Sequence, residues 1–149
     1  MRDPDVSVNA PERGPNSGTC QVYDEATFRY FLELERKRAE PVKRALLLAL
    51  VGFAGKGHKA ARIDAATARG LFAALASCVR EIDVVGWYRT NRIAGAVMPQ
   101  PCNVAKSHAS RSVGERIALS LSRRLPPELS NRFEVQVLQF QAREVSRNA

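Results

Sequence analysis

Two groups of charged residues near the middle of the chain have the types and spacing to bind a ligand. The first is Arg80-x-x-Asp83, and the second is Arg89 with Arg92. An arginine fork can donate two parallel hydrogen bonds to a ligand, and a neighbouring carboxylate can accept hydrogen bonds from the N–H groups of a ligand. The second pair adds positive charge that suits phosphate groups. These four residues are therefore the candidate ligand-binding residues.

A β-hairpin is expected to position both groups. Two strands are predicted at Ile82–Tyr88 and Arg92–Met98, joined by a polar turn at residues 89–91. A helix that Asp64 caps is predicted before them, reaching about Glu81. Arg80 and Asp83 would then lie where this helix gives way to the first strand.

The remaining pattern predicts an α+β fold. The further expected elements are a helix from Ala26 to about Arg38 capped by Asp24, a buried strand over Arg44–Phe53, a helix opened by the capping box Ser112–Glu115 and reaching about Leu125, and an alternating strand over Phe133–Phe140. After the first helix, this order is the split β-α-β-β-α-β unit. The fold class is therefore a ferredoxin-like sandwich with an extra N-terminal helix.

Composition indicates one soluble domain. The chain has 149 residues, 45% hydrophobic and 26% charged, with a net charge of +8. Residues 1–22 are expected to form a disordered arm and residues 23–145 the domain. No signal-peptide pattern is visible, the apolar run Ala45–Ala54 is too short to span a membrane, and three cysteines form no metal or disulfide pattern. We expect a cytoplasmic location.

The hairpin segment resembles the signature region of GGDEF domains, the bacterial nucleotidyl-cyclase-like domains that make cyclic di-GMP. Asp83-Val84-Val85-Gly86-Trp87-Tyr88 is similar to the lead-in of the family's signature turn, and Val97-Met98-Pro99 to its exit. Phe28–Arg38 is similar to the opening helix and Leu46–Phe53 to the first strand. The resemblance covers about residues 26–140 and implies the GGDEF fold.

The chain departs from this family where catalysis would need acidic residues. Ala49 and Val51 stand where the first strand of the family supplies carboxylates, and Arg89-Thr90-Asn91-Arg92-Ile93 stands where the turn reads Gly-Gly-Asp-Glu-Phe. Magnesium-assisted phosphoryl transfer needs oxygen ligands, normally carboxylates. We therefore predict no cyclase activity, no catalytic residue, no metal site and no cofactor.

The resemblance also implies a role for the Arg-x-x-Asp pair. Its spacing before the turn is that of the family's inhibitory site, which binds cyclic di-GMP. The alternative is purely structural, because Arg80 could interact with the negative end of its helix and Asp83 could be a turn residue. Trp87 could stack on a ligand or be buried.

Three functions remain open, with a regulatory receptor for cyclic di-GMP ranked first. The second is a protein-interaction or dimerisation module without a nucleotide ligand, regulating a bacterial assembly such as exopolysaccharide secretion. A residual enzyme ranks last. Nucleic-acid binding suits the charge, but the central strands lack an exposed aromatic pair. The loop Gly52–Gly57 does not fit a Walker motif, and neither His58 nor His108 has suitably spaced metal-ligand partners.

Overall fold

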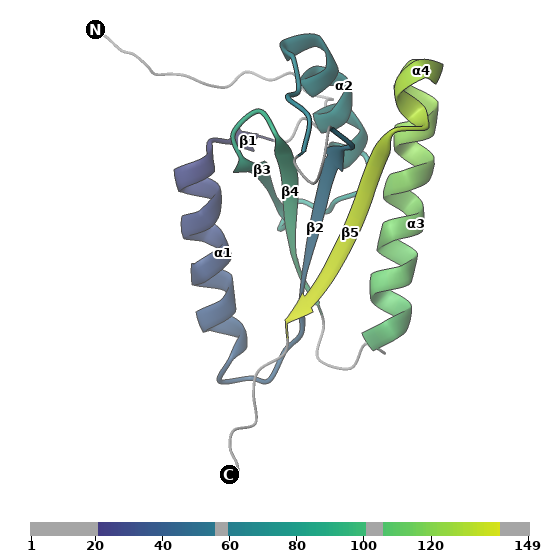
Figure 1. Ribbon diagram of the computed structural model, residues 1–149. Coiled ribbons are helices and arrows are strands. Elements are labelled where there is room, and N and C mark those ends of the chain that lie inside the picture. The colour runs from purple at the N-terminus through teal and green to yellow at the C-terminus, as the bar shows by residue number, and fades with distance from the viewer. Residues whose placement is uncertain (1–20, 56–59, 101–105, 141–149) are drawn as a thin grey trace, which may run out of the picture.

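The computed structural model describes residues 21–55, 60–100 and 106–140. These residues form a mixed sheet with helices on both faces (Figure 1). The elements are β1 (Val22–Tyr23), α1 (Glu25–Ala39), β2 (Leu46–Phe53), α2 (Ala65–Ala76), β3 (Val84–Arg89), β4 (Ile93–Pro99), α3 (Lys106–Arg124), α4 (Pro127–Ser130) and β5 (Phe133–Phe140).

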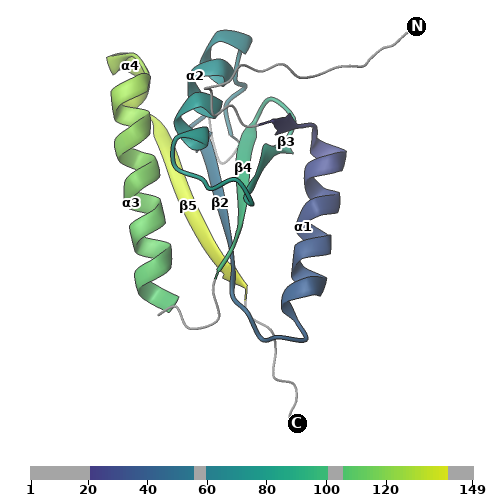
Figure 2. The same ribbon diagram turned by 180° about the vertical axis from the view of Figure 1, so that it is seen from behind.

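The sheet has five strands in the order β1-β3-β4-β2-β5. All neighbouring strands run antiparallel except β1, which pairs with β3 in parallel at Val22 and Tyr23. Helix α1 covers one face, whereas α2 and α3 lie on the other, as the opposite views agree (Figures 1 and 2). This topology confirms the expected ferredoxin-like sandwich with an extra N-terminal helix. Strand β1, which takes Val22 from the expected arm, and helix α4 were not predicted.

Helix α1 begins where Asp24 caps it. The Asp24 carboxylate accepts a hydrogen bond from the Thr27 backbone N–H at 2.9 Å, which lowers the pKa of that carboxyl group. The fully buried Phe28 anchors the helix on the sheet at the paired positions Gly86 and Gly95. A Cβ at Gly95 would lie 2.8 Å from the Phe28 ring. The two paired glycines therefore leave the space in which Phe28 packs, and α1 can lie close to β3 and β4.

Strand β2 is buried on both faces, as its continuous apolar sequence predicts. Its odd-numbered residues pack with α2 and α3, including Leu71, Leu75, Ile117 and Leu121, and its even-numbered residues face α1. Strand β5 occupies the predicted range and pairs with all of β2.

Several predicted boundaries are wrong, including the start of β2, which lies at Leu46 and not at Arg44. Helix α2 ends at Ala76, five residues before Glu81, because Ser77 caps it and donates its hydroxyl to the Ala74 carbonyl at 2.8 Å. Helix α3 begins at Lys106, so Ser112 lies inside the helix and opens no capping box. The hairpin strands start and end one or two residues later than predicted.

Several sequence-based expectations fall outside the described residues. These are the arm over residues 1–20, the loop positions 56–59 with His58, and the chain after Phe140. The side chain of His108 is likewise not described. Within the described ranges, no helix combines the length and the apolarity that a membrane span requires.

Candidate functional site at the hairpin

The turn between β3 and β4 is held in place by helix α1. Glu25 accepts hydrogen bonds from the Thr90 backbone N–H at 2.8 Å and from the Thr90 hydroxyl at 2.9 Å. These bonds, with help from Arg29 and Arg89, lower the pKa of the Glu25 carboxyl group. Asn91 takes a φ of 60°, a conformation that asparagine tolerates better than most residues. The turn therefore presents its two arginines from a fixed backbone.

A pocket of ≈ 750 Å³ opens beside this turn. Arg89 and Arg92 line it, and the backbone N–H of Arg92 donates to the Arg89 carbonyl at 2.9 Å. Arg92 also donates from Nη1 to the Ala60 carbonyl at 2.8 Å, which ties its side chain to another residue of the pocket lining. The remaining lining residues are Leu50, Gly52, Phe53, Ala54, Gly55, Ala60, Ile93, Glu134 and Gln136.

The charge of this pocket suits an anion. Two arginines and one acid, Glu134, line it, so the balance of formal charge is positive. Guanidinium groups bind phosphate oxygens through charge-assisted hydrogen bonds. The pocket therefore has the chemistry to hold a phosphate-bearing ligand against the hairpin.

The same pocket offers little to a magnesium ion. Ala49 and Val51, the positions compared with the family's carboxylates, are fully buried in the core that faces α2 and α3. The β2 residues that line the pocket include Leu50 and Gly52, and neither side chain carries an oxygen ligand. Among the described residues, no three His, Cys, Asp or Glu side chains come together where they could hold a metal.

The other candidate pair, Arg80 and Asp83, lies in the loop between α2 and β3. The Asp83 carboxylate accepts three hydrogen bonds from Arg80: from its backbone N–H at 2.8 Å, from Nε at 3.2 Å and from Nη2 at 2.8 Å. Nη2 also donates to the Pro99 carbonyl at the end of β4. The Asp83 side chain is 1% exposed, whereas that of Arg80 is 48% exposed. The ion pair closes the loop onto the end of the hairpin.

The structure thus brings the four predicted residues together as two pairs, not as one site. Arg89 and Arg92 lie at the turn end of the hairpin, and Arg80 and Asp83 lie at the end where β3 starts and β4 finishes. A strand of the length of β3 spans roughly 20 Å. Trp87 packs against Phe72 of α2 with the two rings nearly perpendicular and their centroids 4.9 Å apart.

Three residues at the site were missed by sequence reasoning. Glu25 anchors the turn from 65 positions away in sequence, so no local pattern could reveal it. Glu134 and Gln136 line the pocket from β5. Their alternation with Val135 and Val137 marks one polar face of that strand, which was the available signal.

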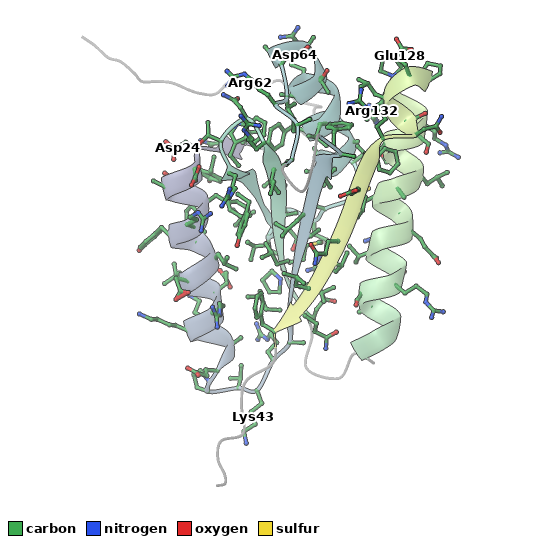
Figure 3. The ribbon with its side chains drawn as sticks, in the orientation of Figure 1. Asp24, Lys43, Arg62, Asp64, Glu128 and Arg132 are labelled. Carbon is green, nitrogen blue, oxygen red and sulfur yellow. The ribbon has the colours of Figure 1, made fainter. Side chains whose placement is uncertain are left out.

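Further charged side chains lie at the end of the molecule that carries the hairpin turn. Figure 3 shows Asp24, Arg62, Asp64 and Arg132 near the end of the molecule that carries the hairpin turn, with Lys43 at the opposite end. Arg132 donates from Nη2 to the Ala54 carbonyl at 3.4 Å, next to the pocket. The turn end therefore carries Arg62 and Arg132 together with the acids Asp24, Asp64 and Glu128.

Among the comparisons with known proteins, only the one with solved structures finds matches. No family model matches the sequence, and no curated protein matches it. A DGC protein from Thermotoga maritima has a similar structure, with a TM-score of 0.60, 18% identity, and 86% of this chain and 87% of that chain covered. The GGDEF domain of DgcB from Caulobacter crescentus, solved with c-di-GMP, gives a TM-score of 0.57 at 14% identity, covering 89% and 81%.

A third similar structure is the diguanylate cyclase SiaD from Pseudomonas aeruginosa, solved in complex with its activator SiaC. It gives a TM-score of 0.54 at 16% identity and covers 85% of this chain and 49% of that one. Identities this low carry the fold and not the chemistry. The described strands and helices of this chain therefore adopt the GGDEF-domain fold, as its hairpin sequence indicated.

Proposed function

We propose that this chain is a regulatory domain with the GGDEF fold that does not cyclise GTP. The observation that carries the proposal is the lining of the hairpin pocket: two arginines, one glutamate and apolar β2 residues. A magnesium ion bridging nucleotide phosphates needs several oxygen ligands in octahedral geometry. Positive charge at the turn opposes a divalent cation, so nucleotide phosphates would meet arginine instead of metal.

The catalytic part is tested by incubating the purified chain with GTP and either magnesium or manganese and measuring nucleotide products by chromatography. We expect no turnover above a protein-free control. An active diguanylate cyclase assayed beside it shows that the conditions support the reaction. Metal-dependent formation of cyclic di-GMP would overturn the proposal.

As ligand of this domain we propose cyclic di-GMP, bound through Arg80. A guanidinium has five N–H donors. Nε and Nη2 of Arg80 are engaged by Asp83 and Pro99, which leaves the Nη1 donors as the free edge of a half-exposed side chain. Full two-point recognition of guanine O6 and N7 would require Nη2 to leave the Pro99 carbonyl. Asp83 would then act mainly by holding Arg80 in place.

Isothermal titration with cyclic di-GMP, with GTP as a second ligand, tests this role. Arg80→Lys keeps the charge but removes the planar fork, so we expect wild-type binding in the micromolar range and loss of most of it in this variant. Arg123→Lys on α3 is the matched control and should bind like the wild type. Absence of heat and of any thermal shift with the wild type would remove the receptor role while leaving the lack of cyclase activity intact.

A second candidate is an interaction module without a nucleotide ligand. One observation favours it: the Asp83 side chain is 1% exposed, and its carboxylate already accepts hydrogen bonds from Arg80 within the loop. A carboxylate in this state cannot accept from guanine unless the ion pair opens. In that case the pair is a structural clamp, and partner binding falls to other surfaces.

A further inference from the structure

Strand β5 lies at one edge of the sheet, and β2 is its only partner strand among the described residues. All eight residues of β5 pair with β2 in one continuous register, without a bulge. In Figures 1 and 2, β5 is the outermost strand on the side of the molecule where α3 stands. Within the described part of the chain, the backbone groups of β5 that point away from β2 therefore meet no other strand.

The hydrogen bonds next to β5 show which of its residues turn their backbone groups outward. The Ala54 N–H donates to the Arg132 carbonyl at 3.0 Å, and this pair continues the register between β2 and β5. Hydrogen-bonded pairs alternate with non-bonded pairs in an antiparallel ladder, so the even-numbered residues of β5 bond to β2. The N–H and C=O groups at the free edge then belong to Phe133, Val135, Val137 and Gln139.

A bond on the other side of β2 agrees with this assignment. The Ala61 N–H donates to the Phe53 carbonyl at 3.0 Å. Phe53 lies opposite Phe133 in the register, so its carbonyl points away from β5, as the residues of a non-bonded pair require. The odd-numbered residues of β5 therefore present both a donor and an acceptor at the open edge.

The sequence of β5 lacks the residues that usually protect an edge strand from pairing. It contains no lysine, proline or glycine, and Glu134 is its single charged residue. Edge strands of natural proteins commonly carry such residues or a bulge, because an open edge is a template for another strand. A regular edge of eight residues without them is typical of a strand that receives a partner.

A groove of ≈ 580 Å³ lies between this edge and α3. From β5, the apolar side chains of Phe133, Val135 and Val137 line it. Small residues line it from α3 at intervals of four, which places them on one side of the helix: Ser110, Gly114 and Ala118. One arginine and one glutamate complete the lining, so their formal charges cancel. The groove can therefore hold apolar side chains of moderate size.

The opposite face of β5 is polar. Glu134 and Gln136 are exposed there and line the hairpin pocket. None of the salt bridges formed by the described residues involves Glu134. Because side chains alternate between the two faces of a strand, a strand added beside β5 would direct every second side chain into the groove and the others toward Glu134. Apolar residues suit the first set, and a basic residue suits the second.

We propose that the open edge of β5 binds an extended segment of a partner protein, which adds to the sheet as an antiparallel strand. Its apolar side chains fill the groove beside α3, and a lysine or arginine pairs with Glu134. Backbone hydrogen bonds to the odd-numbered residues supply affinity, and the two faces supply selectivity for the alternating sequence. Binding at this edge does not involve Arg80 or require a nucleotide.

Amide hydrogen exchange followed by NMR tests the proposal, with a synthetic peptide as long as β5 in which valine alternates with lysine and threonine. In the free chain, the N–H groups of Val135 and Val137 should exchange faster than those of Glu134 and Gln136, which bond to β2. The peptide should slow exchange at Val135 and Val137. The same peptide methylated on the backbone nitrogens that face β5 keeps its side chains but loses those donors, so it should bind at least about tenfold more weakly.

Two pairs of variants test the groove and the charge. Gly114→Leu fills the groove and should weaken peptide binding at least about tenfold, whereas Ser112→Leu, at an exposed position of the same helix, should not. Leucine has a higher helix propensity than glycine, so this loss would not come from a weakened helix. Glu134→Lys should also weaken binding of the lysine-containing peptide. Glu81→Lys, which makes the same change of charge at an exposed loop position, should not.

Three results would overturn the proposal. Slow exchange at Val135 and Val137 in the peptide-free monomer would mean that another part of the chain already covers the edge. Protection of these amides that appears only as the chain concentration rises would mean that a second copy occupies it. Exchange that stays unchanged at millimolar peptide, in a chain whose circular dichroism is native, would mean that the edge accepts no strand.

Discussion

The two ends of the β3–β4 hairpin use arginine in different ways. At the turn end, Arg89 and Arg92 are exposed and line an open pocket with one glutamate. At the other end, Arg80 is bound to a buried carboxylate and to the backbone of Pro99. The first pair has spare donors and surplus charge, while the second is largely neutralised.

Because of this difference, the turn end is available to a ligand, whereas the other end contributes to the stability of the fold. A ligand can reach the open pair without breaking any ion pair, because Arg89 and Arg92 have no carboxylate salt bridge among the described residues. A ligand that uses both members of the closed pair must first disrupt three hydrogen bonds. Identical side chains can therefore serve function at one end and structure at the other.

The largest expected effect comes from breaking the closed pair. Arg80→Ala leaves the Asp83 carboxylate buried, with only a backbone N–H as a remaining partner. Removing one partner of a buried pair is costly, and after allowing for the exposed arginine we expect a loss of about 2 kcal/mol. For a domain of this size, such a loss lowers the melting temperature by roughly 4–12 °C. Differential scanning calorimetry measures it.

Arg89→Ala at the open end is the matched control. We expect a change within about 0.5 kcal/mol, as for other surface substitutions. Equal melting temperatures for the two variants would contradict the division into a structural end and an open end.

A smaller effect is expected on anion affinity at the open pocket. Arg89→Glu replaces a charge-assisted donor with a repelling carboxylate, so binding of GTP in the presence of EDTA should weaken about tenfold or more. Fluorescence anisotropy with a labelled nucleotide checks this, and Arg123→Glu controls for net charge. Affinity that vanishes with EDTA in the wild type would instead indicate a metal site.

The smallest effect concerns the Glu25 contact that holds the turn. Hydrogen bonds from Thr90 lower the Glu25 pKa below its ordinary value of 4.5. The resulting stabilisation is present above that value and is lost as the pH falls through the lower, folded-state pKa. The melting temperatures of wild type and Glu25→Gln should differ slightly at neutral pH and converge near the acidic limit of folding. A difference in melting temperature between the two proteins that grows toward acid pH would refute this contact.

Sequence patterns correctly predicted those elements whose structure depends on residues close together in the chain. Strand β5 was placed residue by residue because polar and apolar side chains alternate along it. The caps at Asp24 and Asp64 were also predicted correctly, since each carboxylate accepts from the backbone three residues later. The end of α2 was misplaced because residues 77–81 look compatible with a helix until Asp83 binds the backbone of Arg80.

The candidate site was only partly predictable. Arg89 and Arg92 were predicted as ligand-binding residues from their charge beside the hairpin turn, and the structure adds the pocket that they line. Glu25 was invisible in the sequence because its contact joins α1 to a turn 65 residues away. Long-range contacts of this kind leave no trace in the spacing of neighbouring residues.

The sequence by itself determined the order of the main helices and strands, although not β1 or α4, together with the apolar faces that build the core and the positive charge at the hairpin turn. These follow from side-chain periodicity and residue type, which act over a few residues. Only the tertiary structure decided that Ala49 and Val51 face the core and that Asp83 is buried against Arg80. Burial depends on which elements pack together, and packing is a property of the whole chain.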